Sequence, residues 1–403
     1  MINNISLKNF KCFQQTDINL SRITLLTGEN SSGKSSVLYG LLAPFQSNDF
    51  PFYLSPNGKY VNMGDFKEIS FNNLKENKIG INISVTDYGE EKRYQTVWGI
   101  DSMNRMPKLN HLRYEEDFLD LDLKMSGENT YTLNLNADNE KGFRTKYENE
   151  KNLNFELDKL YNEIVEGTLP YILDVFTEMD YDALNFIGPF RYEPERTYYQ
   201  KTKADEKVGR AGEGYIDQIS EWENQKAGEF KKLKSVLRNL GLLNAIKARP
   251  LRGGRFELSV KIRPRGVWAS LADVGFGISQ FLPAVVADLQ LSDTSTLLLA
   301  QPEIHLHPSV QASLANYFVR QTRETGKQYI VETHSEYLLN RIRLAIVKQE
   351  IDPSAVSVYY FENSATGSVT YPIEFTRDGQ IKNAPQRFFD TYMLDTMDIA
   401  LYA

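Results

Sequence analysis

The sequence contains little of what stabilises exported or membrane-spanning proteins. It has one cysteine, Cys12, which excludes an internal disulfide framework and fits a reducing compartment, where we expect a small buried thiol rather than a reactive one. No uninterrupted apolar run is long enough to cross a bilayer, and residues 1–8 lack the basic and apolar blocks of an export signal. We therefore expect a cytoplasmic protein.

Sustained heptads, internal repeats and low-complexity tracts are also missing from the sequence. Their absence excludes long coiled-coil arms and repeat architectures. With 403 residues and a hydrophobic content of 41%, the chain can bury a full core, and we expect either one large unit of two lobes or two domains.

What the sequence does contain is a complete phosphate-binding loop, GENSSGKS, at residues 28–35. The residues before it have the pattern of a buried strand and those after it the pattern of a helix start, which is the required order. Gly28 and Gly33 let backbone amides turn toward phosphate oxygens, Lys34 reaches the terminal phosphates, and the Ser35 hydroxyl is a ligand for Mg²⁺. We predict that the chain binds ATP and Mg²⁺. The residues expected to bind them are Asn30, Gly33, Lys34, Ser35 and Ser36.

The remaining patterns predict an antiparallel lobe, a helical lobe and a parallel-sheet core. Alternation predicts a hairpin over residues 5–20 and further strands over 78–100, whereas residues 102–160 are polar and residues 155–176 have helical spacing. A helix over 215–240, a hairpin about Gly253-Gly254, and a strand, helix and strand at 296–299, 309–325 and 328–333 follow. We divide the chain into a β-lobe with the phosphate loop (1–101), a helical lobe with an insertion (102–245) and a C-terminal lobe (246–403).

Three further motifs lie in the C-terminal lobe. Residues 271–285 place two glycines and a serine ahead of an apolar helix, which can form a second anion-binding helix start. Residues 297–308, LLLAQPEIHLHP, end a buried strand in a polar turn, and residues 332–335, ETHS, place His334 at the end of the next strand.

In this order the four motifs resemble the ABC-type ATPases, and within them the SMC-like branch that includes the ATPase half of OLD-family proteins. More narrowly, the chain is similar to compact bacterial ATPases of anti-phage defence operons. Stretches that carry the resemblance are 7–11, 61–66, 187–196, 208–213, 275–280, 301–308 and 385–390. The resemblance implies an α/β fold, an ABC-type P-loop ATPase head with a mixed-sheet core, an N-terminal antiparallel β-lobe and an inserted helical lobe.

The resemblance also implies how the motifs work together. ATP would lie between the phosphate loop of one subunit and the 275–280 signature of another in a head-to-tail dimer. Lys34 and Ser35 match the family's phosphate and magnesium ligands, and His334 matches the histidine that senses the terminal phosphate. The signature residues expected at the nucleotide are Gly275, Gly277 and Ser279.

One part of the family pattern is missing. The magnesium-organising carboxylate falls at Ala300 and the usual general base at Gln301, so neither acid is at its expected position. Glutamine orients a water but cannot accept its proton, and loss of a general base costs a factor of about 10² to 10⁴, so we expect slow hydrolysis. Glu303 is the acid that can partly substitute, and a buried acid satisfied by backbone donors is an equal interpretation.

Other residues leave alternatives open. Residues 231–265 hold many basic side chains and one carboxylate, Glu257, in a chain of net charge −7, and this stretch can bind DNA phosphates, bind an acidic partner or form a solvated surface. His305, His307 and His334 invite a metal site, for which three imidazoles without cysteine are weak support. The aromatic and arginine-rich run 190–199 can stack on bases or pack between lobes.

Three functions compete at this point. The first is an ATP-dependent dimerising switch that controls an effector protein encoded in the same operon, because an OLD-type nuclease would need a further Toprim domain and we expect none. The second is an SMC-like ATPase of DNA repair or maintenance, favoured by the basic stretch. The third, a transporter subunit, has no support from a membrane-domain coupling helix.

Overall fold

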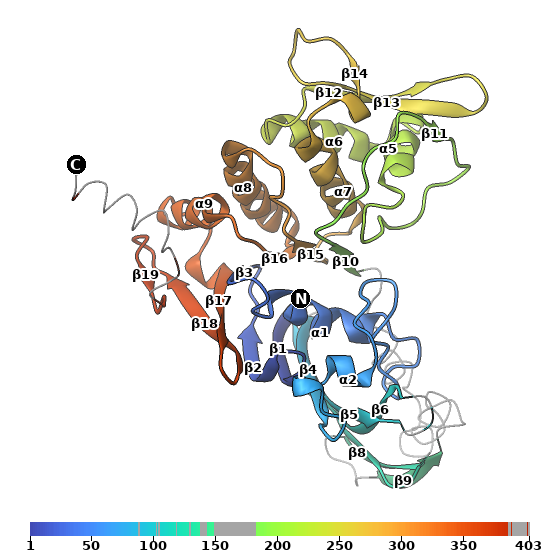
Figure 1. Ribbon diagram of the computed structural model, residues 1–403, viewed down its shortest axis with the longest axis vertical. Helices are drawn as coiled ribbons and strands as arrows, with labels where there is room; N and C mark the ends of the chain where they lie inside the picture. The colour runs from blue at the N-terminus through green and yellow to red at the C-terminus, as the bar shows by residue number, and fades with distance from the viewer. Residues whose placement is uncertain are drawn as a thin grey trace. The chain divides into compact units, whose positions relative to one another are not determined.

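The described residues form three β-sheets, one in the first of two units and two in the second (Figure 1). Unit 1 comprises Met1–Leu20, Ser31–Tyr181 and Glu362–Val369, and unit 2 comprises Ser21–Asn30, Asp182–Phe361 and Thr370–Ala403. The computed structural model describes residues 1–87, 89–101, 103, 105–117, 119–128, 130–137, 143–148, 183–385, 388 and 401.

Unit 1 is built on an eight-stranded antiparallel sheet in the order β2-β1-β4-β5-β6-β7-β8-β9. The predicted N-terminal hairpin and the predicted strands over 78–100 are confirmed, because one side of each strand is apolar and buried. The strands are β1 (Ile2–Phe10), β2 (Phe13–Asn19), β4 (Ile79–Asp87), β5 (Glu90–Ile100), β6 (Pro107–Glu116), β7 (Leu119–Met125), β8 (Thr130–Ala137) and β9 (Phe143–Glu148). Helix α1 (Lys34–Phe45) packs against β1, and two short helices, α2 (Phe66–Ile69) and η1 (Phe71–Asn73), follow it.

Residues 107–148 correct the sequence-based division of the chain. We expected an insertion within a helical lobe here, and the described residues instead form strands β6–β9 of the antiparallel sheet. The polar composition was misleading because every second residue faces away from the core: Leu121 and Leu123 are buried, and Asp122 lies between them on the opposite side. The helical spacing over 155–176 lies outside the described residues.

Unit 2 contains a seven-stranded sheet in the order β10-β15-β16-β3-β17-β18-β19, with the phosphate-loop strand β3 between β16 and β17. The pairings from β10 to β17 are parallel, and β18 pairs with β19 in antiparallel fashion. The predicted mixed-sheet α/β core is therefore confirmed. The strands are β3 (Ile23–Gly28), β10 (Leu184–Ile187), β15 (Thr296–Ala300), β16 (Gln328–Glu332), β17 (Val356–Ser364), β18 (Gly367–Phe375) and β19 (Ile381–Lys382).

The predicted helices after the 271–285 motif and over 309–325 are α7 (Phe276–Gln290) and α8 (Pro308–Thr325). A further helix that the sequence analysis did not predict, α9 (Glu336–Val347), follows β16. Helix α8 begins with His307 as N-cap and Pro308 in its first turn, and it ends at Gly326, whose φ of 68° suits glycine. Among the described residues, no helix is both long enough and apolar enough to cross a membrane.

A second, smaller sheet lies in unit 2 with two helices. The sheet contains β11 (Tyr198–Tyr199), β13 (Arg255–Lys261), β12 (Ala245–Pro250) and β14 (Ala269–Ser270), so the predicted hairpin about Gly253-Gly254 is confirmed. The predicted single helix over 215–240 is wrong: α5 (Tyr215–Asn224) and α6 (Gly228–Asn239) are separate, because Lys226 has φ 54°, which a helix cannot accommodate.

Candidate nucleotide-binding site

The phosphate loop begins at Gly28, at the carboxyl end of β3. Gly28 has φ 129° and pairs with Phe361 of β17, and a Cβ at this position would lie 2.2 Å from the Phe361 carbonyl oxygen. The following amide, that of Glu29, donates to the same carbonyl at 3.0 Å. The first glycine is therefore required twice, by the backbone angle and by the close approach of β17.

Gly33 ends the loop and caps α1. Its φ is 98°, and an added Cβ would lie 2.5 Å from both Cys12 Sγ and Phe13 Cζ, so the turn between β1 and β2 supports the loop from behind. The N-cap of α1 is Gly33, which has no side chain with which to cap the helix, and the N-terminus of a helix favours a negatively charged group. These two glycine positions fix the course of the backbone at both ends of the predicted phosphate loop.

The side chains of the loop differ in burial. Asn30 and Ser31 are exposed, Ser35 and Ser36 are half-buried, and Lys34 is 4% exposed. Lys34 is thus more enclosed than the sequence interpretation assumed. A substitution that keeps its aliphatic volume is the better test of its charge.

The carboxyl ends of β15 and β16 lie at the same sheet edge as the start of the loop. Ala300 pairs with Glu332, Glu332 pairs with Leu26, and the Thr333 amide donates to the Leu26 carbonyl at 2.9 Å. Gln301 therefore follows a strand that lies two places from β3, at the edge where open α/β sheets bind ligands.

Gln301 is held in an unusual backbone conformation. Its φ is 47°, in a region that few residues other than glycine adopt, and its amide donates to the Glu332 carbonyl at 2.7 Å. The neighbouring Ala300 is 3% exposed, and its carbonyl accepts a 2.9 Å hydrogen bond from Arg191 Nη2. The strand end is tightly fixed without a carboxylate at either position.

Glu303 is the acid of this turn, and it is buried, with 7% of its surface exposed. Its Oε1 accepts a 2.7 Å hydrogen bond from the His334 amide, while Oε2 has no partner among the described residues. Burial raises the pKa of the Glu303 carboxyl, and hydrogen bonds and the attraction of Arg191 lower it in part. A buried carboxyl with a raised pKa fits both a substitute base and a buried structural acid, the two interpretations that the sequence left open. As a structural acid, however, it has a described hydrogen-bond partner on only one of its two oxygens.

Arg191 is a site residue to which the sequence analysis gave no role. It is 6% exposed, burial lowers its pKa to about 10, and Glu303 partly offsets this. Its Nε and Nη1 have no hydrogen-bond partner among the described residues. Its position in the sequence could have indicated this role. Arg191 follows β10 closely, and β10 pairs with β15 in parallel, so both strands end at the sheet edge where Gln301 lies.

The histidines have different surroundings. His334 is exposed, and its backbone is fixed by Glu303. His307 caps α8, with Nδ1 3.3 Å from the Ser309 amide, whereas the His305 ring packs edge-on against Phe276 at 4.8 Å. In the described part of the chain, no group of three or more His, Cys, Asp or Glu side chains is arranged to hold a metal.

The signature stretch forms the start of α7 and packs on the turn that carries Glu303. Gly275 and Phe276 are exposed, and a Cβ at Gly277 would lie 2.4 Å from the His305 carbonyl oxygen. Ser279 is buried, and its hydroxyl donates to the Phe276 carbonyl at 2.8 Å within the helix. Of the three predicted signature contacts, Gly275 is therefore the most accessible.

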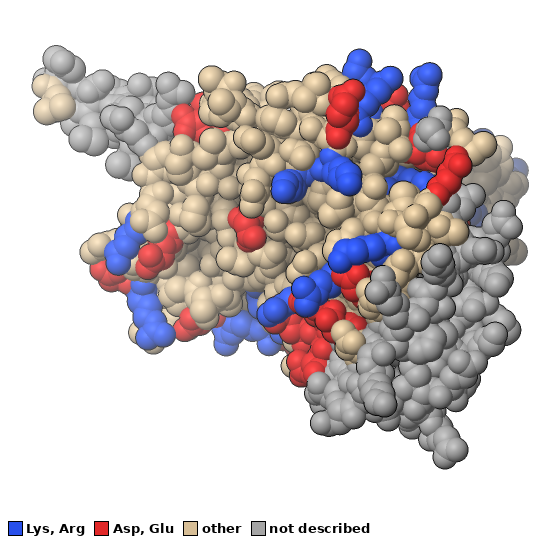
Figure 2. All heavy atoms as spheres, turned by 90° about the horizontal axis from the view of Figure 1, so that it is seen from below, with Lys and Arg blue, Asp and Glu red and all other residues tan. Residues whose placement is uncertain are grey.

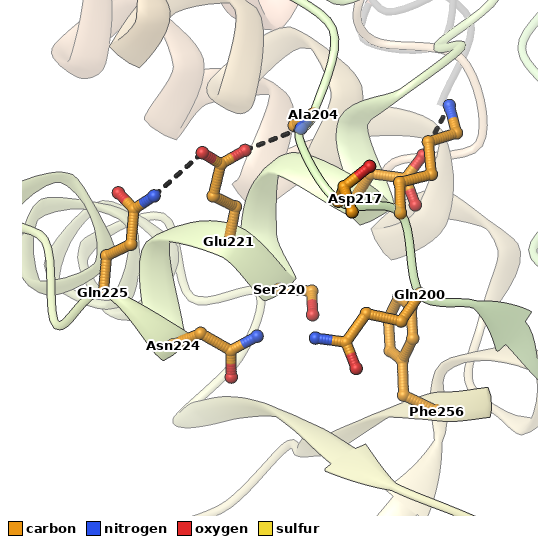
Figure 3. A pocket seen from close by; sticks show the side chains of 10 residues that line it. Gln200, Ala204, Asp217, Ser220, Glu221, Asn224, Gln225 and Phe256 are labelled. Carbon is orange, nitrogen blue, oxygen red and sulfur yellow. Dashed lines mark hydrogen bonds and ion pairs between the residues drawn. The ribbon is translucent and has the colours of Figure 1, made fainter. Parts of the chain in front are cut away.

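A polar pocket of about 220 Å³ lies elsewhere in unit 2, beside α5 (Figure 3). Its charged side chains are already paired: Glu221 accepts from the Ala204 amide at 2.7 Å, and Lys201 lies 3.0 Å from Asp217. Gln200 and Ser220 point toward its centre (Figure 3). The pocket contains none of the predicted nucleotide residues, and its network fixes the loop after β11.

With the loop, the sheet edge and the signature in place, comparison with known families is decisive. Residues 23–340 match the family described as "AAA domain, putative AbiEii toxin, Type IV TA system". The chain belongs to this AAA-domain family. Residues 351–399 of this AAA-domain protein also match a family described as a protein of unknown function (DUF3696). No curated protein sequence matches the chain.

Three solved structures that are similar to the chain are SMC heads. The SMC head domain from Thermotoga maritima is 14% identical with a TM-score of 0.44, covering 93% of this chain and 99% of that one. An SMC head bound to the C-winged helix domain of ScpA is 13% identical with a TM-score of 0.46, covering 93% and 98%. The Smc head with an extended coiled coil bound to the C-terminal domain of ScpA from Pyrococcus furiosus is 12% identical with a TM-score of 0.44, covering 100% and 98%. At these scores, the family match and the sheet topology carry the assignment of a P-loop ATPase fold.

Proposed function

We propose that this AAA-domain protein is a cytoplasmic, ATP-dependent switch that dimerises head to tail and controls a partner effector in bacterial anti-phage defence. It would be a compact relative of the ATPase half of OLD-type proteins. Its Lys34 and Ser35 would bind the phosphates and Mg²⁺, and Gly275 and Gly277 would approach the nucleotide of the other subunit, with Ser279 shaping that helix start. His334 would sense the terminal phosphate.

The observation that carries the proposal is the turn 300–303. Ala300 and Gln301 replace the usual acidic pair, and Glu303, buried and half satisfied, is the acid that remains on the turn. A missing base slows hydrolysis by about 10² to 10⁴. Slow hydrolysis prolongs the ATP-bound state, which suits a switch better than a motor.

A chain of contacts supports communication between the signature and this turn. Gln280 of α7 donates to the Arg191 carbonyl at 3.3 Å, and the Arg191 guanidinium bonds the Ala300 carbonyl and attracts Glu303. Gln280 and Arg191 are hydrogen-bonded to each other, and Arg191 attracts Glu303. Movement of the start of α7 on dimerisation would therefore change the surroundings of the Glu303 carboxyl.

Dimerisation can be tested with one substitution and a matched control. Gly275 has no atom within 4 Å of an added Cβ and has negative φ, so Gly275→Arg fits the isolated subunit and should block only a second subunit's nucleotide. Gly228, the first residue of α6, is equally open, and Gly228→Arg is the control. We expect ATP and Mg²⁺ to induce dimers, measured by light scattering, in the parent and in Gly228→Arg but not in Gly275→Arg, with ATP binding retained in all three.

ATP-dependent dimers of Gly275→Arg equal to those of the parent would contradict the head-to-tail arrangement. The partner is tested separately, by copurifying the tagged chain with the products of neighbouring genes in the presence of ATP or ADP. Copurification of one such product that differs between ATP and ADP supports the switch. Equal copurification with ATP and with ADP contradicts it.

A second candidate is an SMC-like ATPase that acts on DNA in repair or maintenance. The basic residues of the hairpin β12–β13 favour it. Their arrangement supports a more specific inference.

A further inference from the structure

The small sheet of unit 2 has two chemically different faces. Ile246, Phe256, Leu258 and Val260 alternate along β12 and β13 and are buried in the core with Leu233 of α6. Helices α5 and α6 lie on that side of the sheet (Figure 1). The other residues of these strands therefore form a second face that the helices do not cover, which we call the outer face.

The outer face is lined by cations and aromatic rings. Tyr199 pairs with Arg255 across β11 and β13, and Lys247 and Arg249 of β12 lie opposite Ser259 and Glu257 of β13. Tyr199 is 69% exposed, and Trp268, just before β14, is 41% exposed. The outer face is defined by Tyr199, Lys247, Arg249, Arg255, Glu257, Ser259, Lys261 and Trp268.

The cations are held directly over the rings. Lys247 Nζ lies 4.2 Å and Lys261 Nζ 5.2 Å from the centroid of the Trp268 ring, and the Arg255 guanidinium lies 4.9 Å from that of Tyr199. Arg255 also donates to the Thr197 hydroxyl. Each ring therefore lies beside at least one positive charge, as in surfaces that bind a phosphate and the flat base attached to it.

The local charge is opposite to that of the chain. Residues 245–270 contain seven basic side chains and one acidic, in a chain of net charge −7. The single acid, Glu257, is engaged by Arg249 at 3.3 Å and by the Ser259 hydroxyl at 3.0 Å. Elsewhere, as on the face that Figure 2 shows, described basic and acidic side chains lie next to one another. The outer face thus concentrates positive charge in a chain whose net charge is negative.

The outer face is also preformed. The Gln200 amide donates to the Gly254 carbonyl at 2.9 Å, which ties β11 to the turn between β12 and β13. The loop that follows β11 is fixed by the Glu221 bond to the Ala204 amide (Figure 3). Little ordering is then needed when a ligand binds, which favours affinity.

We propose that the outer face binds single-stranded nucleic acid, with Arg255, Lys261 and their neighbours on the phosphates and Tyr199 and Trp268 stacking on bases. Unpaired bases are required because a duplex keeps its base faces stacked inside. An acidic protein would satisfy the cations but would leave the two exposed rings without a matching flat group. The proposal concerns a surface outside the nucleotide site and stands whether or not ATP drives dimerisation.

Fluorescence anisotropy with labelled oligonucleotides of about 20 nucleotides, longer than one single-strand site, tests this over a range of KCl. Poly-dT, poly-rU, a DNA duplex of equal length and poly-L-glutamate are the ligands. We expect both single strands to bind more tightly than the duplex and than poly-L-glutamate. The ratio of the affinities for poly-dT and poly-rU distinguishes DNA from RNA.

The variants separate stacking from charge. Trp268→Ala and Tyr199→Ala should each weaken binding about 5- to 150-fold without changing the salt slope. Arg255→Gln with Lys261→Gln should flatten the slope of log affinity against log salt by about 1.4, from about 0.7 for each phosphate contact of a single strand. The control, Lys231→Gln with Lys232→Gln, removes two exposed charges of α6 outside the outer face and should change neither.

Trp268 also supplies a direct signal. Of the three tryptophans, Trp98 and Trp222 are buried, so quenching of intrinsic fluorescence by poly-dT should come from Trp268 and disappear in Trp268→Phe. Tighter binding of the duplex or of poly-L-glutamate than of the single strands would overturn the proposal. An equal change of the salt slope in the Arg255→Gln, Lys261→Gln variant and in the Lys231→Gln, Lys232→Gln control would also overturn it. Thermal denaturation of every variant confirms that loss of binding is not loss of fold.

Discussion

Replacement of Glu303 by glutamine is the most informative single change in the site. Glutamine keeps the shape of the side chain and can still accept the 2.7 Å hydrogen bond from the His334 amide. It removes the negative charge that faces Arg191 and the Oε2 lone pairs that no described residue uses. If Glu303 accepts a proton from the attacking water, hydrolysis should fall by about 10² to 10⁴, or about 3 to 5.5 kcal/mol in the barrier.

The effect of Glu303→Gln on the free energy of unfolding combines two opposed contributions. Burial raises the pKa of Glu303 in the folded state, so its protonated form favours folding. That contribution is complete below the unfolded pKa and is lost as pH rises through the folded pKa. Glutamine resembles the protonated form, but it also removes the attraction to the buried Arg191, so Glu303→Gln should lower the free energy of unfolding at neutral pH less than Asp288→Asn does.

The same raised pKa predicts the pH dependence of the reaction. Glu303 must be ionised to act as a base, so the hydrolysis rate should increase with pH through a pKa above the ordinary glutamate value. The residual rate of Glu303→Gln should lack this dependence. Single-turnover phosphate release, measured across pH at saturating ATP and Mg²⁺, gives both results.

A control separates chemistry from the general cost of removing a buried acid. Asp288→Asn changes a 1% exposed acid of α7 that accepts a hydrogen bond from the Tyr329 hydroxyl at 2.8 Å and lies outside the nucleotide residues. It should keep its turnover per folded molecule. Parent-like turnover by a folded Glu303→Gln that still binds ATP would refute the assignment of Glu303 as the base.

Three further predictions follow from particular contacts. Lys34→Met, which keeps the volume of a 4% exposed side chain, should fold normally and lose affinity for a fluorescent ATP analogue; undiminished affinity would remove Lys34 from the site. Gln301→Glu should increase steady-state phosphate release, whereas fast turnover by the parent would show that a complete base is already present. Asp288→Asn should lose about 3 to 5 kcal/mol of unfolding free energy in urea, because Lys327, 3% exposed and 3.5 Å away, would lose the carboxylate with which it forms a buried ion pair; a change below about 1 kcal/mol would contradict the importance of that pair.

The sequence by itself determined the features that depend on local order along the chain. Strand, glycine loop and helix at Gly28 to Ser35 predicted the phosphate loop, since its geometry is set by consecutive residues. Alternation predicted the N-terminal hairpin, and the Gly253-Gly254 turn predicted the hairpin of β12 and β13. Even the strands of 107–148 were readable, had alternation been given more weight than polar composition.

Tertiary structure alone decided which distant residues meet. Arg191 and Glu303 interact because β10 and β15 are parallel neighbours, and strand order is not encoded in either segment. The burial that raises the pKa of Glu303 and lowers that of Arg191 depends on all the elements packed around them. Likewise, Tyr199 and Trp268 join the cations of one face only because β11, β13, β12 and the residues before β14 come together in a single sheet. Local pattern fixes where a side chain lies on its own strand, and the pairing of strands fixes its neighbours.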